Sequence, residues 1–397
     1  MARINRVNPI NRRKFLQMSA GLTGLAATLT ACGGNPTPTP APAEAKPTEA
    51  PAAAVPAADS TVDKSKLAKE LSWYTWGGYW SDDVLKKFTA EFGVKIKADT
   101  FSSNEELEAK FKAGGNPGYD LITPSDYMVS KLITAGLVEK INFANIPNVK
   151  NLDPGHIKLY FDPTGEYSVA YNWGSTGLAY DKTKVKEPIT SWKQIMEWPA
   201  ELKGKLGLLD DVRETMAVPL RYKGFSGNTD NPDEINTAKQ LLIDLKKKAN
   251  YTMADSPTNK TNLVAGDVVA AQIYTNDAVT ARTDNPNIVY VIPTEVSTIW
   301  QDNVCVPKGA PSPYTAEVFI NFLLRPEISA QMANEVGLST PNAETLKQGL
   351  IDKKLADDKT VYIDIAGMGN HLDYLRKGNP KVDQLYLDAF QAVKAAS

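Results

Sequence analysis

Strand-like and helix-like segments alternate along residues 71–136, and this alternation constrains the fold more than any other feature of the sequence. Short apolar or alternating runs at 71–76, 94–98 and 119–123 have the pattern of β-strands. After each run, apolar residues recur at helical spacing, and glycine ends the helical segment. Strands separated by helices need crossover connections, so the pattern predicts a mostly parallel, doubly wound α/β sheet.

The middle of the chain repeats this logic around a pair of acids. An apolar run at 206–209 breaks at Asp210 and then resumes with helical spacing, which predicts a buried strand, a turn and a helix. Asp211 and Glu214 are three residues apart and therefore share one face of that helix. Acids at this position commonly cap the helix, but α/β folds also place ligand sites at the carboxyl ends of strands.

The first 31 residues have the order of a bacterial export signal. A twin-arginine pattern at 12–14 precedes a mildly apolar run over 18–29, which is too short to span a bilayer. The sequence Leu-Thr-Ala-Cys that ends at Cys32 resembles the lipobox of bacterial lipoproteins, whose cysteine is acylated and becomes the first mature residue. We expect a signal peptide over 1–31 and a lipid anchor at Cys32. The twin-arginine and general secretory routes both remain open.

The segment after the signal is expected to be a disordered tether. Residues 32–68 are rich in Pro, Ala and Thr, a composition that cannot bury a core. With Cys32 acylated, Cys305 cannot form an intrachain disulfide, and its apolar neighbours predict a small core residue. Loss of the five basic residues before Cys32 lowers the formal net charge from −2 to −7, which disfavours a nucleic-acid partner.

Aromatic and acidic side chains gather near the ends of predicted strands. The usual fate of Trp and Tyr is core packing, but aromatic faces attract ammonium groups at ~0.5–2 kcal/mol each. Carboxylates add charge-assisted hydrogen bonds at ~1.5–3 kcal/mol each. The combination therefore indicates a site for a flexible organic polycation. The residues are Trp76, Tyr127, Tyr274 and Trp300 among the aromatics, and Asp211, Glu214, Asp277 and Asp302 among the acids.

Several motifs, spread from about Leu71 nearly to the C-terminus, resemble those of the substrate-binding proteins of polyamine (spermidine/putrescine) ABC importers. They are Tyr74-Thr75-Trp76, Tyr119-Asp120-Leu121 with Pro124-Ser125, Asn151-Leu152-Asp153-Pro154, Tyr171-Asn172-Trp173-Gly174, Ser226-Gly227-Asn228-Thr229, Asn321-Phe322-Leu323-Leu324-Arg325-Pro326 and Thr340-Pro341-Asn342.

The resemblance implies a two-lobed periplasmic-binding-protein type II fold, with mostly parallel doubly wound sheets joined by a hinge and the ligand in the cleft. Lobe 1 would comprise 69–175 and 301–346, and lobe 2 would comprise 176–300 and 347–397. The chain would cross between the lobes near 173–175 and 301, with a further return near Lys347.

The resemblance also implies the ligand-binding residues. Trp76, Ser125 and Tyr127 match contacts on lobe 1, and Tyr274 stands where the family usually has Trp. The remaining matches are Asp211, Glu214, Asp277, Trp300 and Asp302.

The chain also departs from the family pattern. Gly78 replaces a usual acid, and we hypothesise that Asp126 substitutes for that acid. Leu338 stands at a family tyrosine, and a late polar contact has no match near 369–371.

The implied function is a monomeric, lipid-anchored extracytoplasmic protein that passes spermidine or putrescine to an ABC permease. Asp211 favours the triamine and Asp277 the diamine, so the choice stays open. No catalytic or metal cluster and no cofactor motif is evident, and His156 is expected at the surface. The alternatives are binding of ferric iron, an amino acid or an aminophosphonate, or a sensory or structural role.

Overall fold

The computed structural model describes residues 62–337, 339–364, 372–376 and 379–396. The predicted signal peptide, Cys32 and most of the predicted tether lie outside the described residues, as do Leu338 and residues 365–371. The chain divides into two units, Met1–Pro56 and Ala57–Ser397, and the following description concerns the second. Within its described part, no helix is both long and apolar enough to cross a bilayer.

The smaller of two sheets is parallel and confirms the predicted alternation of strands and helices. Its strand order is β2-β1-β3, and the Cα register runs from Glu70 opposite Lys95 to Trp76 opposite Phe101. The elements, in chain order, are β1 (Glu70–Trp76), α1 (Asp82–Phe92), β2 (Lys95–Phe101), α2 (Asn104–Gly114), β3 (Leu121–Ile122) and α3 (Asp126–Thr134).

Helix α1 illustrates how the local sequence sets these elements. The Ser81 hydroxyl accepts a hydrogen bond from the Val84 amide and caps the first turn. Val84, Phe88 and Phe92 are spaced by four residues, so they form one buried stripe. Gly93 ends the helix with φ 73°, a left-handed conformation that glycine adopts without a steric penalty.

The larger sheet is mixed. Its order is β10-β9-β4-β7-β5-β6, with β8 also paired to β4. The described β10–β9, β5–β6 and β5–β7 pairs are parallel, and β4 is antiparallel to β7, β8 and β9. The strands are β4 (Val169–Asp181), β5 (Leu206–Leu209), β6 (Thr252–Ala254), β7 (Ala270–Tyr274), β8 (Ile288–Val291), β9 (Ser297–Val304) and β10 (Leu372–Asp373).

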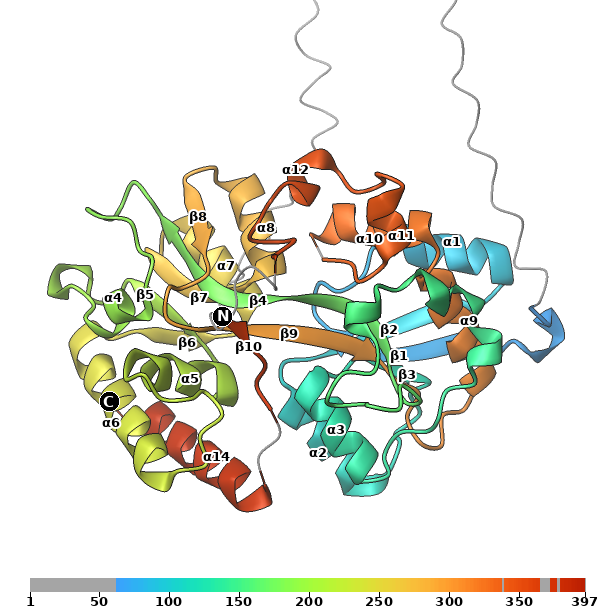
Figure 1. The fold of residues 1–397 in the computed structure, drawn as a ribbon, viewed down its shortest axis with the longest axis horizontal. Coiled ribbons are helices and arrows are strands. Elements are labelled where there is room, and N and C mark those ends of the chain that lie inside the picture. The colour runs from blue at the N-terminus through green and yellow to red at the C-terminus, as the bar shows by residue number, and fades with distance from the viewer. Residues whose placement is uncertain (1–61, 338, 365–371, 377–378, 397) are drawn as a thin grey trace, which may run out of the picture. The chain divides into compact units, whose positions relative to one another are not determined.

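Some of the remaining helices pack against the larger sheet, and others lie where the chain returns toward the smaller sheet (Figure 1). Helix α14 contacts both α5 and α6, although it follows them by more than 130 residues. The helices are α4 (Trp192–Met196), α5 (Val212–Tyr222), α6 (Pro232–Ala249), α7 (Ser256–Ala265), α8 (Thr275–Asp284), α9 (Pro313–Leu323), α10 (Pro326–Val336), α11 (Ala343–Lys347), α12 (Lys353–Ala356) and α14 (Pro380–Ala395).

The paired strands β4 and β9 link the two sheets. Figure 1 shows them running together from the helices around the larger sheet toward those around the smaller one. At its far end β9 leads to Cys305, which bridges Ile122 of β3, and Asp302 bridges Ser125 at the start of α3. The antiparallel pair of β4 and β9 therefore fixes the positions of side chains on the two sheets relative to each other.

Strand β9 corrects one sequence expectation. The sequence pattern put Trp300 and Asp302 near the ends of predicted strands, but both lie inside a continuous strand from Ser297 to Val304. All eight residues of β9 are buried, so the strand lacks the polar–apolar alternation by which a half-exposed strand is recognised. Cys305 is fully buried, which confirms its predicted place in the core.

A substitution in the core around β1, α1 and α9 tests how this part is stabilised. Phe319 is fully buried and packs edge-on against Trp73 and Phe88, with ring centroids 5.6 and 4.8 Å away. Phe319→Ala should lower the free energy of unfolding by ~3–5 kcal/mol, because it removes apolar contacts and leaves a cavity. Urea denaturation of the full chain measures this change. Leu346→Ala, at a side chain that is 42% exposed, is the control and should cost under about 1 kcal/mol.

Candidate ligand-binding site

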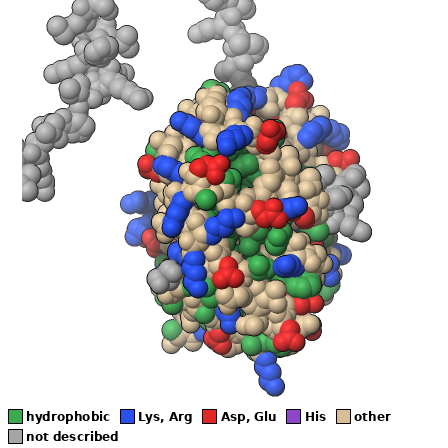
Figure 2. All heavy atoms as spheres, turned by 90° about the vertical axis from the view of Figure 1, so that its left-hand side faces the viewer, with side chains coloured by type: hydrophobic (Ala, Val, Ile, Leu, Met, Phe, Trp, Pro, Cys, Tyr) green, Lys and Arg blue, Asp and Glu red, His purple; other side chains and the backbone are tan. Residues whose placement is uncertain are grey.

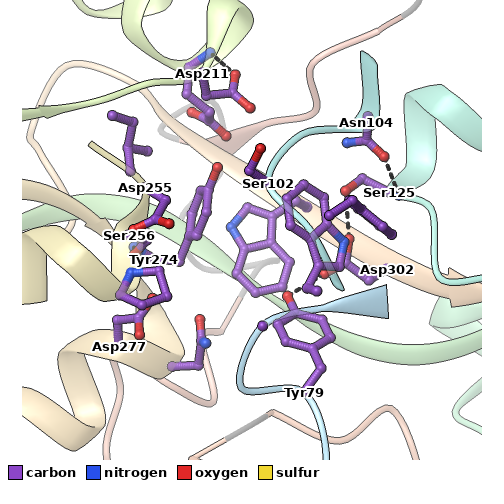
Figure 3. A pocket seen from close by; sticks show the side chains of 18 of the residues that line it. Tyr79, Ser102, Asn104, Ser125, Asp211, Asp255, Ser256, Tyr274, Asp277 and Asp302 are labelled. Atoms are coloured by element: carbon purple, nitrogen blue, oxygen red, sulfur yellow. Dashed lines mark hydrogen bonds between the residues drawn. The ribbon is translucent and has the colours of Figure 1, made fainter. Parts of the chain in front are cut away.

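One cavity of about 390 Å³ brings the sequence-predicted ligand residues together. It is lined by residues that follow strands of the smaller sheet and by residues of β7, β9, α5 and α8. Figure 3 shows acids on opposite sides of this space with aromatic rings between them. All nine predicted residues line it, namely Trp76, Ser125, Tyr127, Asp211, Glu214, Tyr274, Asp277, Trp300 and Asp302.

Asp302 forms a buried carboxylate corner with two hydroxyl groups. Its Oδ1 accepts a hydrogen bond from Ser125 Oγ at 2.6 Å, and its Oδ2 accepts one from the Tyr79 hydroxyl at 2.5 Å (Figure 3). Burial raises the pKa of Asp302 to about 6, although both hydroxyl donors favour the charged form. Tyr79 was not predicted from the sequence. Its position three residues after Trp76 is the one signal that could have identified it.

Asp211 serves as a helix cap and also lines the cavity, so the two interpretations of this acid are compatible. Its Oδ1 accepts hydrogen bonds from the amides of Arg213 and Glu214 at 3.0 and 2.9 Å. Burial, together with the neighbouring charge of Glu214, raises the pKa of Asp211 to about 6. The cap therefore fixes the carboxylate at the cavity wall with oxygen lone pairs to spare.

Glu214 is held between β4 and β9 by two hydroxyl donors. Thr176 Oγ1 donates to its Oε1 and Thr298 Oγ1 donates to its Oε2, both at 2.8 Å. Burial raises the pKa of Glu214, and the buried guanidinium of Arg221 opposes this rise. Arg221 Nη1 also donates to Thr298 Oγ1 at 2.9 Å, so a positive charge supports Glu214 from behind. A side chain at Gly227 would crowd that guanidinium, because a Cβ there would lie 3.3 Å from Arg221 Nε.

A third acidic corner lies at the beginnings of α7 and α8. Burial raises the pKa of Asp277 to about 6, the Ser256 hydroxyl opposes this rise, and the charge of Asp255 adds to it. Asp255 caps α7 by accepting from the Thr258 amide at 2.9 Å. Asp255, Ser256 and the neighbouring Asn276 line the cavity, yet the sequence reasoning missed them. The Asp-Ser-Pro start of α7 reads as an ordinary cap, so it gave no signal of ligand binding.

The aromatic residues form the walls between these acidic corners. Tyr274 and Trp300 meet edge to face with ring centroids 5.8 Å apart, and Trp76 packs on Phe101 at 4.5 Å. Gly174, opposite Trp300 in the β4–β9 register, makes room for the indole. A Cβ at Gly174 would lie 2.7 Å from that ring.

Asp126 also lines the cavity, close to the corner formed by Asp302. Its two oxygens accept hydrogen bonds from the amides of Tyr127 and Gln301 at 2.6 and 3.3 Å. Burial raises its pKa well above the ordinary value. Gly78 has φ 76°, a backbone conformation that disfavours an acidic side chain at that position. Whether Asp126 replaces the missing acid stays a hypothesis.

The charge of the cavity has a single sign. Its described lining contains eight acids and no Lys or Arg, and among them Asp210 is neutralised by Lys394 at 2.7 Å. By contrast, basic and acidic side chains are interspersed on the outer face shown in Figure 2. The acids are Glu106, Asp126, Asp210, Asp211, Glu214, Asp255, Asp277 and Asp302.

Histidine does not contribute a metal site in the part of the chain that the structure describes. No group of three or more His, Cys, Asp or Glu there is arranged to hold a metal ion. His156 was expected at the surface, but it is half-buried, and its Nδ1 lies 2.8 Å from Gln301 Oε1. The expectation was wrong because a turn sequence does not reveal that β9 passes beneath it.

Comparisons with known proteins agree with this architecture. Residues 83–361 match the family described as bacterial extracellular solute-binding protein. The chain is 36% identical over 301 residues to the spermidine/putrescine-binding periplasmic protein of Escherichia coli K12, covering 76% of this chain and 85% of that protein. It is 32% identical to a putrescine-binding periplasmic protein of Pseudomonas aeruginosa over 74% of this chain and 83% of the relative.

Solved structures are similar as well. A putative spermidine/putrescine ABC transporter protein from Listeria monocytogenes has a TM-score of 0.78 and 30% identity, covering 83% of this chain and all of that one. A spermidine/putrescine substrate-binding protein from Streptococcus pneumoniae has a TM-score of 0.69 and 31% identity, with 82% and 99% covered. The predicted two-lobed, type II α/β fold is thereby confirmed. The predicted lobe boundaries stay a prediction.

The raised pKa of Asp277 leads to a test on the protein without ligand. The folded state holds a proton up to about pH 6, whereas the unfolded chain loses it near the ordinary value of 3.8. This acid therefore makes the folded state progressively less stable as pH rises from about 4 to about 6. Relative to the unsubstituted protein, the free energy of unfolding of Asp277→Asn should rise by about 1–3 kcal/mol across that window. Urea unfolding at several pH values measures this change. Asp284→Asn, at an exposed position on the same helix, should show no such pH-dependent gain in stability. Equal pH dependence of the two variants would contradict the raised pKa of Asp277.

Proposed function

Because the chain belongs to the bacterial extracellular solute-binding protein family, we propose that it captures spermidine or putrescine in this cavity and delivers it to an ABC importer. The observation that carries the proposal is the set of carboxylates around an aromatic-walled cavity whose described lining has no basic side chain. Buried carboxylates without a cation are costly, and an organic polycation removes that cost. The flat rings suit its methylene segments, and each ring attracts a neighbouring ammonium group.

The nine predicted residues take three roles in this proposal. Asp211, Glu214, Asp277 and Asp302 neutralise ammonium groups, and Ser125 positions Asp302 through its 2.6 Å hydrogen bond. Trp76, Tyr127, Tyr274 and Trp300 wall the hydrocarbon segments.

The same charge pattern weighs against the other ligands considered. An amino acid or an aminophosphonate carries an anionic group that needs Arg, Lys or a backbone nest, and the described lining has no Arg or Lys. Ferric iron needs clustered tyrosines with His or acids, and the described residues hold no candidate metal group. Relatives that carry solutes to transporters, rather than enzymes, also support a role in binding.

The β4–β9 ladder is the proposed hinge. Trp173 and Gln301, at which the sequence predicted crossings, stand opposite each other in its register. Bending there would open the cavity, and a ligand that contacts both sides would favour the closed state. The proposed lobes are 69–175 with 301–346 and 176–300 with 347–397.

The setting of this activity follows from the same reasoning. The family and its periplasmic relatives support an extracytoplasmic protein. We propose that acylated Cys32 anchors a monomer to the membrane through the tether over 32–68, beside the permease. Radiolabelled fatty-acid incorporation that is lost in Cys32→Ser would support the anchor.

Calorimetric titration with spermidine, putrescine, glutamate and ferric citrate tests the function. We expect heat with one or both amines at micromolar affinity or tighter and none with the other two ligands. Asp302→Asn should weaken amine binding about 10- to 150-fold, because it removes a charge-assisted hydrogen bond in a buried site. The exposed variant Asp284→Asn should bind like the unsubstituted protein. Absence of heat with both amines would reject the function.

Asp126→Asn tests whether this acid replaces the one missing at Gly78. Asp126 shares a corner with Asp302, so a charged Asp126 would add to the attraction of one ammonium group. We expect the variant to bind amines about 3- to 30-fold more weakly, measured by the same titration. Asn is close in shape, but its single amide oxygen can accept only one of the hydrogen bonds that Asp126 receives from the Tyr127 and Gln301 amides, so urea unfolding of the variant accompanies the titration. Unchanged affinity would eliminate the hypothesis.

A further inference from the structure

Glu105 lies beside the corner of the cavity that Asp211 occupies, and it is not among the nine residues proposed to bind the ligand. It belongs to the first turn of α2, between Asn104 and Glu106, which both line the cavity. Its Oε1 accepts a hydrogen bond from the Tyr127 hydroxyl at 3.1 Å, and the Tyr127 side chain is itself part of the cavity wall. The carboxyl group is therefore held at the cavity by a residue that the site already contains.

Glu105 and Asp211 approach each other from different sheets. Glu105 follows β2 of the smaller sheet, whereas Asp211 follows β5 of the larger one. Burial and then the charge of Asp211 raise the pKa of Glu105 to about 7. Two neighbouring buried carboxyl groups of this kind hold a proton when the site is empty, since both cannot be charged at low cost.

The basic side chains nearby are engaged elsewhere. Lys131 of α3 favours the charged form of Glu105, but less than Asp211 disfavours it. Its Nζ contacts Glu108 at 2.8 Å and Asp383 at 3.8 Å. Arg213 of α5, the other basic group at this corner, donates from Nη1 to the carbonyl of Arg376 at 3.1 Å and lies over the Tyr386 ring. The pair of carboxyl groups therefore has room for one more cation.

We propose that Glu105 and Asp211 jointly bind a cationic nitrogen, and that this corner makes the site prefer a linear triamine over a diamine. The inference rests on the polyamine binding proposed above. Asp302 in β9 and Asp277 in α8 provide acidic corners for the two end groups of a diamine. The additional corner formed by Glu105 and Asp211 is useful only to a ligand with a third nitrogen. An ammonium group donates up to three hydrogen bonds, so it can join both carboxylates at once.

The test compares spermidine and putrescine on the full-length protein by calorimetric titration. Glu105→Gln should weaken spermidine binding about tenfold or more and change putrescine binding by less than about twofold. Glu108→Gln is the matched control on the same helix, because the Glu108 carboxylate is held by Lys112 and Lys131 rather than by a residue of the cavity wall. It should leave the preference between the two amines unchanged.

A pH series adds a measurement that would not change if the role of Glu105 were merely structural. In the unsubstituted protein, the preference for spermidine should increase as pH rises from about 6 to 8, because Glu105 then loses its proton. Glu105→Gln should abolish this increase. If Glu105→Gln does not fold, the pH series on the unsubstituted protein is the test. A preference for spermidine over putrescine that does not change with pH overturns the inference.

The two proposals fail in different ways. Absence of binding to both amines by the unsubstituted protein rejects the proposed function. Binding of both amines with a preference that Glu105→Gln does not alter rejects only the role of Glu105. An equal loss of affinity for both ligands in Glu105→Gln also rejects it, since the corner formed by Glu105 and Asp211 would then not discriminate between them.

Discussion

The concentration of buried carboxylates around one cavity is the constraint on which the rest of this structure depends. Burial opposes ionisation, and the pKa values of Asp211, Asp277 and Asp302 rise to about 6 as a result. The fold tolerates this cost because each acid is held by local donors, such as the Ser125 and Tyr79 hydroxyls at Asp302. A cavity built in this way is most stable when a cation occupies it.

The supporting framework explains how distant segments provide one site. Strands β4 and β9 pair over a long register, and they place Trp300 and Asp302 in the middle of the cavity. The same ladder supplies Thr176 and Thr298, which fix Glu214 from both sides. Since these strands also link the two sheets, the elements that hold the ligand are also those on which any opening motion would act. Binding and closure would then share one set of contacts.

The departures from the expected family pattern fall at informative positions. Gly78, which stands where the family pattern has an acid, adopts a left-handed conformation. Asp126 lines the cavity near Asp302, and Asp255 does so near Asp277. These two acids add to the acidic character of the cavity from positions outside the motifs by which the chain resembles the family. Ligand choice in this chain can consequently depend on residues outside the family motifs.

The sequence by itself determined the α/β class, most strands and helices, the buried Cys305 and nine of the residues that line the cavity. These rest on local patterns, such as the stripe of Val84, Phe88 and Phe92, or on the motifs by which the sequence resembles the family. Only the tertiary structure decided that β9 is one continuous strand and that Tyr79 reaches Asp302. It also decided that Glu105, which accepts a hydrogen bond from Tyr127, lies near enough to Asp211 for their charges to interact. Those facts arise from contacts between residues about 100 or more apart in sequence, and no local pattern encodes such contacts.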